Sequence, residues 1–241
     1  MTHVVALWRY PVKSMQGESL NVASIGPAGI VGDRIWAVVD RETRLGLTAR
    51  RAPELLFAHA ALDGDDVRIT LPDGTVAADD DALSRWLGRG VTLVRAGGDT
   101  VGRFEIGLAD GDDADRDPTV EWFQWEGPAG TFHDSTRTQV SIIGADTVGA
   151  WDMRRFRPNV VVAGTGEDEW VGSAIEIGNT RLDVVKAIDR CVMTTRPQPG
   201  GIDRDLDVLR TINRDRASNL GVGTLVRTPG TVRVGDAIRS D

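Results

Sequence analysis

The sequence is poor in the residues that most often build metal centres and covalent cross-links. Its 241 residues include one cysteine, Cys191, and three histidines, His3, His59 and His133. A lone cysteine cannot close a disulfide within the chain, and one thiolate is too few for a tetrahedral cysteine zinc site. The histidines have neither metal-ligand spacing nor a hydrolase motif. Three uses of Cys191 stay open: a buried apolar residue, a reactive nucleophile, or a single thiolate ligand to a metal cofactor.

Long apolar segments and an excess of positive charge are also missing. No apolar stretch approaches the length of a membrane span, and the N-terminus lacks the basic region and apolar run of a signal peptide. The net charge is −8 and the pI about 5.0, whereas nucleic-acid-binding surfaces are basic. These absences argue against nucleic acid or membrane as partners. With no disulfide available, they indicate a reducing, cytoplasmic location.

The sequence does contain many short β-prone runs separated by turns, and it has 28 glycines. The expected strands cover residues 4–10, 33–40, 67–71, 91–95, 139–143, 159–163, 174–177, 181–188, 225–227 and 232–234, the last two as a closing hairpin. Short helices are expected at residues 82–87, 146–153 and 206–212. The pattern predicts an α+β, predominantly β fold, a barrel or sandwich with short helices as decoration. An acidic run at residues 110–117 is interpreted as a solvated loop between two domains.

Three stretches carry residues suited to chemistry. Lys13 and Ser14 follow the first strand, where an ammonium and a hydroxyl could meet an anion, although a solvated loop lysine is the ordinary reading. Arg157 precedes Pro158 and is expected to be extended, so that its guanidinium forms either an anion clamp or an ion pair. Arg190 beside Cys191 favours a thiolate, against the alternative of a small buried hydrophobic residue.

Taken together, these stretches resemble one family over nearly the whole chain. The matching segments are residues 10–14 (YPVKS), 32–36 (GDRIW), 48–50 (TAR), 155–159 (RFRPN), 190–195 (RCVMTT) and 229–236 (PGTVRVGD). They look like MOSC-domain proteins in which an N-terminal β-barrel-like domain precedes the MOSC β-barrel. The resemblance implies two domains, residues 1–112 and 113–241.

The resemblance also implies a molybdenum cofactor, held by its pterin dithiolene and by the MOSC cysteine. Cys191 would be the metal ligand and catalytic residue. The implied cofactor contacts are Lys13, Ser14, Arg34, Arg157 and Asn159, with Ser135 and Thr136 as a looser pair. The chemistry agrees, because a phosphorylated pterin needs local positive charge in an acidic protein, and a thiolate is a soft ligand suited to the metal.

The activity implied is that of a molybdenum-cofactor-dependent reductase of N-oxygenated, chiefly N-hydroxylated, compounds. Without further cysteines no iron–sulfur cluster can be bound, so electrons would come from a separate redox partner of flavin, ferredoxin or cytochrome type. Asp134 and Asp189 are acid–base candidates by proximity in sequence only. The alternative is a cofactor-binding or sulfur-carrier module without turnover, as in the C-terminal part of molybdenum-cofactor sulfurases, whose pyridoxal-phosphate domain is not expected here.

Overall fold

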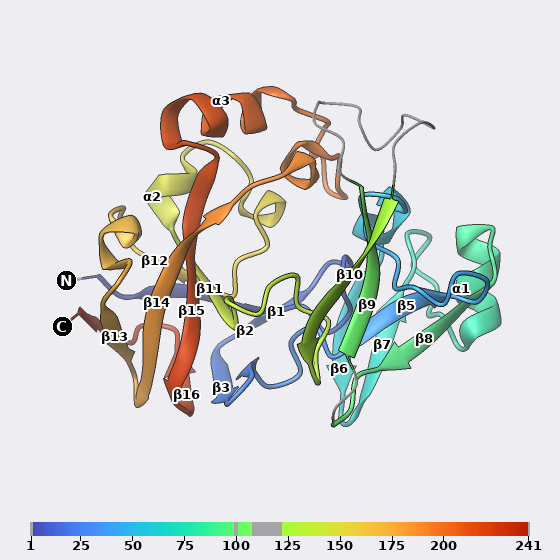
Figure 1. The fold of residues 1–241 in the computed structure, drawn as a ribbon, viewed down its shortest axis with the longest axis horizontal. Helices are drawn as coiled ribbons and strands as arrows, with labels where there is room; N and C mark the ends of the chain where they lie inside the picture. Colours follow the sequence, from blue (N-terminus) through green and yellow to red (C-terminus); the bar gives the residue numbers. More distant parts are fainter. Residues whose placement is uncertain (1, 99–100, 108–121, 241) are drawn as a thin grey trace.

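The computed structural model describes residues 2–98, 101–107 and 122–240, and the fold is built mainly of strands (Figure 1). The first part of the chain forms β1 (Val4–Arg9), β2 (Glu18–Leu20), β3 (Val22–Gly26), β4 (Gly29–Ile30), β5 (Trp36–Asp40), β6 (His59–Asp63), β7 (Asp66–Thr70), β8 (Val91–Arg95) and β9 (Val101–Gly107). The second part forms β10 (Trp122–Ala129), β11 (Val140–Gly144), β12 (Val160–Val162), β13 (Ala174–Ile177), β14 (Thr180–Asp189), β15 (Asn219–Thr228), β16 (Gly230–Arg233) and β17 (Ile238–Ser240).

Helices are few and short. The α-helices are α1 (Asp80–Leu87), α2 (Ala145–Val148) and α3 (Asp207–Arg216), and the 3-10 helices are η1 (Pro53–Phe57), η3 (Met153–Arg155), η4 (Glu167–Trp170) and η5 (Val192–Thr195). The expected helix at residues 82–87 is confirmed as α1. Its start is fixed by Asp79, whose carboxylate accepts from the Ala82 amide at 2.7 Å, and its end by Gly88 with φ +65°. None of the helices in the described ranges is long and apolar enough to cross a membrane.

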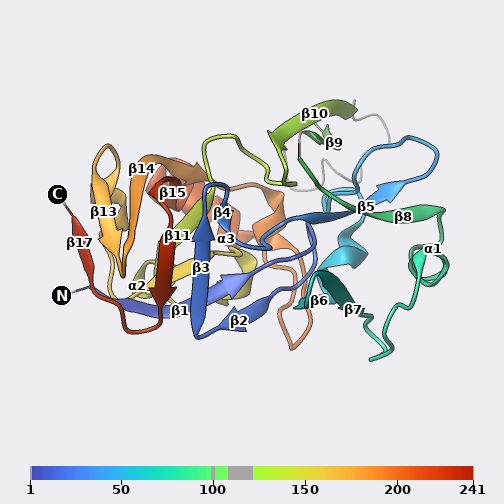
Figure 2. The ribbon, with the colours of Figure 1, turned by 90° about the horizontal axis from the view of Figure 1, so that it is seen from below.

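A curled eight-stranded sheet organises one half of the molecule, in the order β17-β13-β14-β15-β11-β12-β1-β2. Only β11 and β12 run parallel among its neighbouring pairs. The sheet includes the first strand of the chain, so the N-terminus and C-terminus lie close together at one end (Figure 1). Seen from below, the small sheets β5–β8 and β6–β7 with helix α1 lie at the opposite end (Figure 2).

The hydrophobic core is divided among several clusters. One lies between the eight-stranded sheet and the three-stranded sheet β16-β3-β4, and another lies between the large sheet and helices α2 and α3. Val160 and Val162 point into the first cluster and Val161 into the second, so β12 is buried on both faces. A further cluster fills the N-terminal half, and Met193 packs against it from the Cys191 loop. The loop that carries the only cysteine thus joins the two halves.

The predominantly β, α+β fold predicted from the sequence is confirmed, and β13 and β14 form the expected hairpin.

The expected closing hairpin is wrong, because β16 pairs with β3 and not with β15. The chain instead crosses at Gly230 to pair with β3. A side chain at Gly230 would clash with Asn179, whose side-chain oxygen accepts from the Thr231 amide. The expected helix at residues 146–153 is limited to α2 and η3. The acidic run and the proposed domain boundary at residues 112 and 113 lie outside the described residues.

Candidate cofactor and active site

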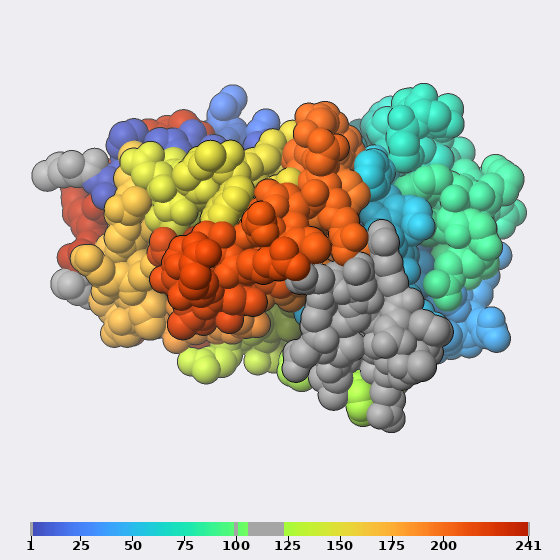
Figure 3. Space-filling view, turned by 90° about the horizontal axis from the view of Figure 1, so that it is seen from above, coloured from blue at the N-terminus to red at the C-terminus, as the bar shows by residue number. Residues whose placement is uncertain are grey.

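A cavity of about 510 Å³ opens where the two halves meet, and both halves line it. Figure 3 shows the surface above this seam, where the orange segment that follows Cys191 lies against the cyan N-terminal segment around residue 55. Two long-range contacts hold this seam. The Gln16 side chain donates to that of Gln198 at 2.8 Å, and Arg196 donates to the Arg50 carbonyl at 3.2 Å. The cavity is therefore assembled only when both parts of the chain are folded.

Three predicted site residues that line the cavity share an unusual backbone. Ser14, Arg34 and Arg157 have φ angles of 70°, 51° and 50°, in the left-handed region that residues with a Cβ rarely adopt. They are three of the six such residues in the described part of the chain. The expectation that Arg157 is extended before Pro158 is therefore wrong. Unfavourable backbone conformations of this kind cluster at functional sites, where the surrounding structure holds them in place.

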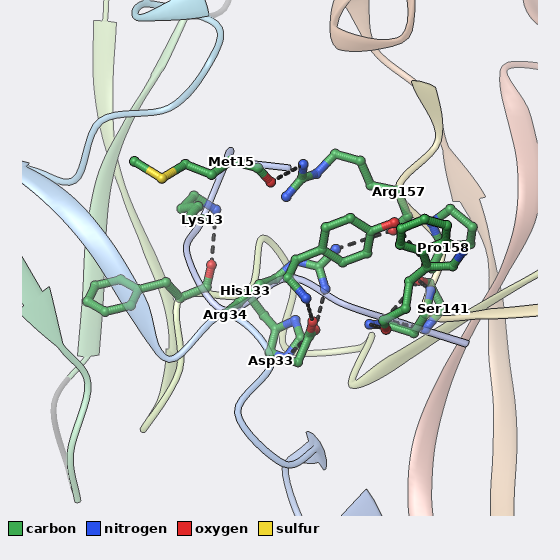
Figure 4. Close-up of polar contacts among 12 residues, drawn as sticks. Lys13, Met15, Asp33, Arg34, His133, Ser141, Arg157 and Pro158 are labelled. Carbon is green, nitrogen blue, oxygen red and sulfur yellow. Dashed lines mark hydrogen bonds and ion pairs between the residues drawn. The ribbon is translucent and has the colours of Figure 1, made fainter. Parts of the chain in front are cut away.

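The buried Tyr10 ring lies behind the cavity wall, against two arginines that line the cavity. It lies between two guanidinium groups, with the Arg34 carbon 5.0 Å and the Arg157 carbon 4.3 Å from the ring centroid. Its hydroxyl donates to the Pro158 carbonyl at 3.1 Å and its amide donates to Asp33 at 2.7 Å (Figure 4). Burial raises the pKa of Tyr10 above its usual value, so the phenol stays neutral. Cation–π contact and the Asp33 carboxylate, which pairs with Arg34, keep the two cations together.

Arg157 is only partly satisfied by the protein. Its Nη1 donates to the Met15 carbonyl at 2.5 Å, but its Nη2 is buried and has no hydrogen-bond partner in the described structure. Burial has the largest effect on the pKa of Arg157 and the nearby charge of Arg34 the next. Together they lower this pKa to about 10, so Arg157 is still charged at neutral pH. A buried guanidinium nitrogen without a partner costs free energy, and an anion in the cavity would remove that cost.

Arg190 repeats this arrangement near Cys191. Its Nε donates to the Leu220 carbonyl at 2.8 Å and its Nη1 to the Phe156 carbonyl at 3.0 Å, whereas its buried Nη2 has no partner in the described residues. Burial lowers its pKa to about 10. Arg157 and Arg190 on the cavity wall therefore each have a buried donor without a partner among the described residues.

Cys191 lies two residues after the end of β14, directly before η5, and is partly exposed in the cavity wall. Its carbonyl accepts from the Thr194 amide at 3.1 Å and hydroxyl at 3.0 Å, which fixes the loop. Its side chain is hydrogen-bonded to Arg50. Burial lowers the pKa of Arg50, but Cys191, Asp134 and Asp189 together outweigh burial and raise it. The cation that touches the thiol is thus Arg50, which the sequence reading did not single out as a site residue.

Lys13 occupies a different place from the one expected for a cofactor contact. It is buried, and its Nζ donates to the Phe132 carbonyl at 3.0 Å (Figure 4). The same Nζ donates to Asp134 at 2.5 Å and lies 3.9 Å from the Phe104 ring centroid. It is absent from the cavity lining, which includes Asp134. Lys13 therefore holds the segment that forms the rim of the cavity.

The remaining predicted contacts also differ in whether they line the cavity. Asn159 is buried in the cavity wall, and its amide is used by the protein: the oxygen accepts from the Ser141 amide at 3.1 Å and hydroxyl at 3.0 Å, and the nitrogen donates to the Trp8 carbonyl at 3.3 Å. Ser135 lines the cavity, with its hydroxyl accepting from the Arg137 amide at 3.0 Å. Thr136 is exposed and does not line it.

His133 is a second residue that the sequence reading missed. It is buried in the cavity wall, and its Nε2 has no hydrogen-bond partner among the described residues, with Asp33 at 3.9 Å. Burial, and to a smaller extent the charge of Arg34, lower the pKa of His133 to about 4, so the imidazole is neutral at physiological pH. Its position directly before Asp134 is the one signal that the sequence offered.

Two family models match the chain in the order of its two halves. The MOSC N-terminal beta barrel domain matches residues 1–95, and the MOSC domain matches residues 132–239. The chain belongs to the MOSC family. The MOSC half supplies Cys191, Arg157 and Arg190 to the cavity, and the N-terminal half supplies Ser14, Arg34 and Arg50.

Among curated relatives, Mitochondrial amidoxime-reducing component 1 of Homo sapiens is 24% identical over 289 residues, covering 98% of this MOSC protein and 82% of the relative. Mitochondrial amidoxime reducing component 2 of Bos taurus is 22% identical over 282 residues, covering 98% and 82%. Among solved structures, the YUAD protein from Bacillus subtilis aligns over 100% of this chain and 96% of its own at 14% identity, with a TM-score of 0.46. The expected cytoplasmic location is wrong by this comparison, since these relatives are named as mitochondrial. A reducing compartment, which is all that a single cysteine indicates, does not distinguish the two.

Proposed function

We propose that this MOSC protein binds a molybdenum cofactor and reduces N-hydroxylated compounds with electrons from a separate redox partner. One observation carries the proposal: the only thiol of the chain faces a cavity whose walls hold buried guanidinium nitrogens that have no partner among the described residues. The names of the curated relatives, amidoxime-reducing components, agree with this reaction.

The residues fit the cofactor. An anionic pterin phosphate would accept from Arg157 and Arg190, whose spare Nη2 atoms are otherwise costly to bury. Ser14 and Arg34 line the same wall. A volume of about 510 Å³ lies within the usual range for a cofactor site. In the described part of the chain, no three His, Cys, Asp or Glu side chains gather as a metal site. Cys191 would therefore be the single protein ligand, and the cofactor's own sulfurs would supply others.

The reaction breaks an N–O bond. An N-hydroxylated base takes up two electrons and two protons and leaves as the parent base and one water molecule. The bound cofactor would supply the two-electron redox chemistry. The electrons come from a separate partner of flavin, ferredoxin or cytochrome type. The protein's own residues bind and orient the cofactor, and Arg50 holds the Cys191 side chain through a hydrogen bond.

The two carboxylates near Cys191 cannot serve as proton donors at neutral pH. Lys13 and Arg34 outweigh the effect of burial and lower the pKa of Asp134 to about 2. The hydrogen bond from Lys186 lowers the pKa of Asp189. Both groups are therefore ionised when the enzyme works. They can accept a proton or orient a positively polarised group, and the protons consumed in the reaction must come from solvent or from the substrate.

The decisive test is metal and pterin analysis of protein expressed in a molybdenum-competent host. We expect about one molybdenum atom per chain and turnover of benzamidoxime with reduced methyl viologen as the donor. Cys191→Ala should lower turnover by about a hundredfold or more, because a metal ligand is lost. Ser173→Ala, whose hydroxyl bonds only the nearby Trp170 carbonyl, serves as the control.

Two results would overturn the proposal. Full metal content and full activity in Cys191→Ala would remove the ligand assignment. A persulfide on Cys191 in protein that holds cofactor but never turns over would identify a sulfur-carrier module in place of a reductase.

A further inference from the structure

An aromatic side chain stands at the open end of the cavity, on the two-stranded sheet β9–β10. Trp125 of β10 lies directly opposite Phe104 of β9. Opposed residues of an antiparallel pair project from the same face of the sheet. Phe104 is fully buried, so this face looks into the protein. The next pair, Arg103 and Glu126, projects from the other face and forms an ion pair at 3.0 Å with both side chains more than half exposed.

Trp125 is nevertheless 44% exposed. An inward-facing tryptophan is exposed to this extent only where the space in front of it is open, and the space here is the cavity, which Trp125 lines. The ring belongs to none of the hydrophobic clusters formed by the described residues. Phe104 anchors the strand beside it in the core, so the ring is presented on a fixed support. A large apolar ring kept open on a cavity is suited to binding a planar partner.

Two ionised carboxylates accompany the ring at this end of the cavity. The side chains of Asp134 and Asp189 are 78% and 75% exposed, and both groups line the cavity. Lys13 and Lys186 each hold one of them, at 2.5 and 2.8 Å. The open end, by which we mean the exposed part of the cavity lining, therefore combines an aromatic face with carboxylate oxygens. The buried end, its shielded part, carries Arg34 and Arg157. A ligand with an extended π system and N–H donors suits the open end, and an anion suits the buried end.

We propose that Trp125 is a specificity-determining residue, which stacks on the planar conjugated part of the substrate and so favours aryl N-hydroxylated bases over small aliphatic ones. The inference rests on the proposed function, since it assigns the open end to the substrate and the buried end to the cofactor. The exposure of the ring supports this assignment, because a permanently bound cofactor is held by buried groups and a substrate must enter and leave.

The test compares benzamidoxime with acetamidoxime, which share the reacting group and differ in the aromatic ring. In the cofactor-loaded protein, Trp125→Ala should raise the KM for benzamidoxime about tenfold, the effect of losing a stacking partner. The KM for acetamidoxime should change by less than about threefold. Trp125→Phe, which keeps a ring, should recover most of the difference. Phe123→Ala is the matched control, because Phe123 is an exposed aromatic residue of the same strand outside the cavity lining.

Calorimetric titration of the loaded protein with benzamidoxime separates this inference from the proposed function. Binding that weakens about tenfold in Trp125→Ala supports stacking even if the protein turns over neither compound, a result that would overturn the reductase proposal alone. Equal losses for both compounds, unchanged binding, or no binding by the unmodified protein would overturn the role of Trp125. A fall in molybdenum and pterin content in Trp125→Ala would also overturn it, because the ring would then hold the cofactor.

Discussion

The two ends of the cavity are built on opposite principles. At the buried end, Arg34 and Arg157 lie against the buried Tyr10 ring and are held by backbone carbonyls and the Asp33 carboxylate, mostly shielded from water. At the open end, Asp134 and Asp189 have side chains exposed to solvent and are held by single lysines. Groups shielded by packing are held in one geometry, whereas carboxylates exposed to solvent can adjust their positions. The buried end is therefore preorganised for a permanently bound group, whereas the open end suits ligands that enter and leave.

The largest expected effect of this division is at Arg157. Replacing Arg157 with Ala should weaken cofactor retention by about a hundredfold, because a charge-assisted bond to the anion is lost. Arg157→Lys, which keeps the charge but not the planar fork, should fall between. Molybdenum and phosphate content after gel filtration measures the effect. Arg137→Ala removes an exposed arginine outside the cavity lining and should leave both unchanged. Equal cofactor retention in Arg157→Ala and Arg137→Ala would contradict the assignment of the buried end to the cofactor.

The next effect is a dependence of stability on pH that originates at the buried end. The pKa of His133 is lowered from 6.5 to about 4, so the unfolded chain binds a proton before the folded one does. The resulting stability is fully present above pH 6.5 and is lost as the pH falls toward 4, by up to about 3 kcal/mol. Urea midpoints at pH 7.5 and 5 should therefore differ more in the unmodified protein than in His133→Gln.

The exposed residue His59 provides the control for this pH effect. His59→Gln should keep the full pH dependence. Asp134 does not contribute to this effect between pH 7.5 and 5. Its pKa is lowered from 3.8 to about 2, so the stability that it provides is lost only as the pH falls below 3.8. If His133→Gln and the unmodified protein lose stability in parallel between pH 7.5 and 5, the buried end is not the source.

The site could be predicted from the sequence in part, and the limits are physical. Local patterns located many of the strands, helix α1 and the motifs that carry Ser14, Arg157 and Cys191, but they missed strands such as β3, β6 and β10. Local patterns could not show that Lys13 donates to Phe132, 119 residues away, and so holds the rim and not the cavity lining. That partnership depends on how the two halves pack.

The same limit explains the residues that were missed. Arg50 lies within a recognisable motif, but only the packing of the Cys191 loop on the N-terminal half brings its guanidinium to the thiol. Trp125 lies in a strand whose inner and outer faces cannot be assigned without its register against β9. The closing hairpin was predicted from turn residues alone, and the pairing of β16 with β3 depends on contacts made elsewhere.

A smaller effect is expected from the Tyr10 hydroxyl, which lies behind the buried end of the cavity. Tyr10→Phe keeps the ring between Arg34 and Arg157 and removes only the hydrogen bond to the Pro158 carbonyl. Unfolding free energy should fall by about 1 kcal/mol, or roughly 2–4 °C in melting temperature. Cofactor content should not change, since both cations stay in place. Loss of cofactor in Tyr10→Phe, measured on the same sample, would show that the hydroxyl and not the stacking positions the arginines.

The smallest effect should come from the open end. Asp189→Asn removes the charge that pairs with Lys186 at 2.8 Å, and this pair is exposed enough to contribute at most about 0.5 kcal/mol to stability. Melting temperature and molybdenum content should match those of the unmodified protein, and the KM for benzamidoxime should shift by less than about threefold. The shift should shrink further at high salt, because exposed charges are screened. A loss of cofactor in Asp189→Asn as large as that in Arg157→Ala would mean that both ends hold the resident group, and the division of the cavity would be wrong.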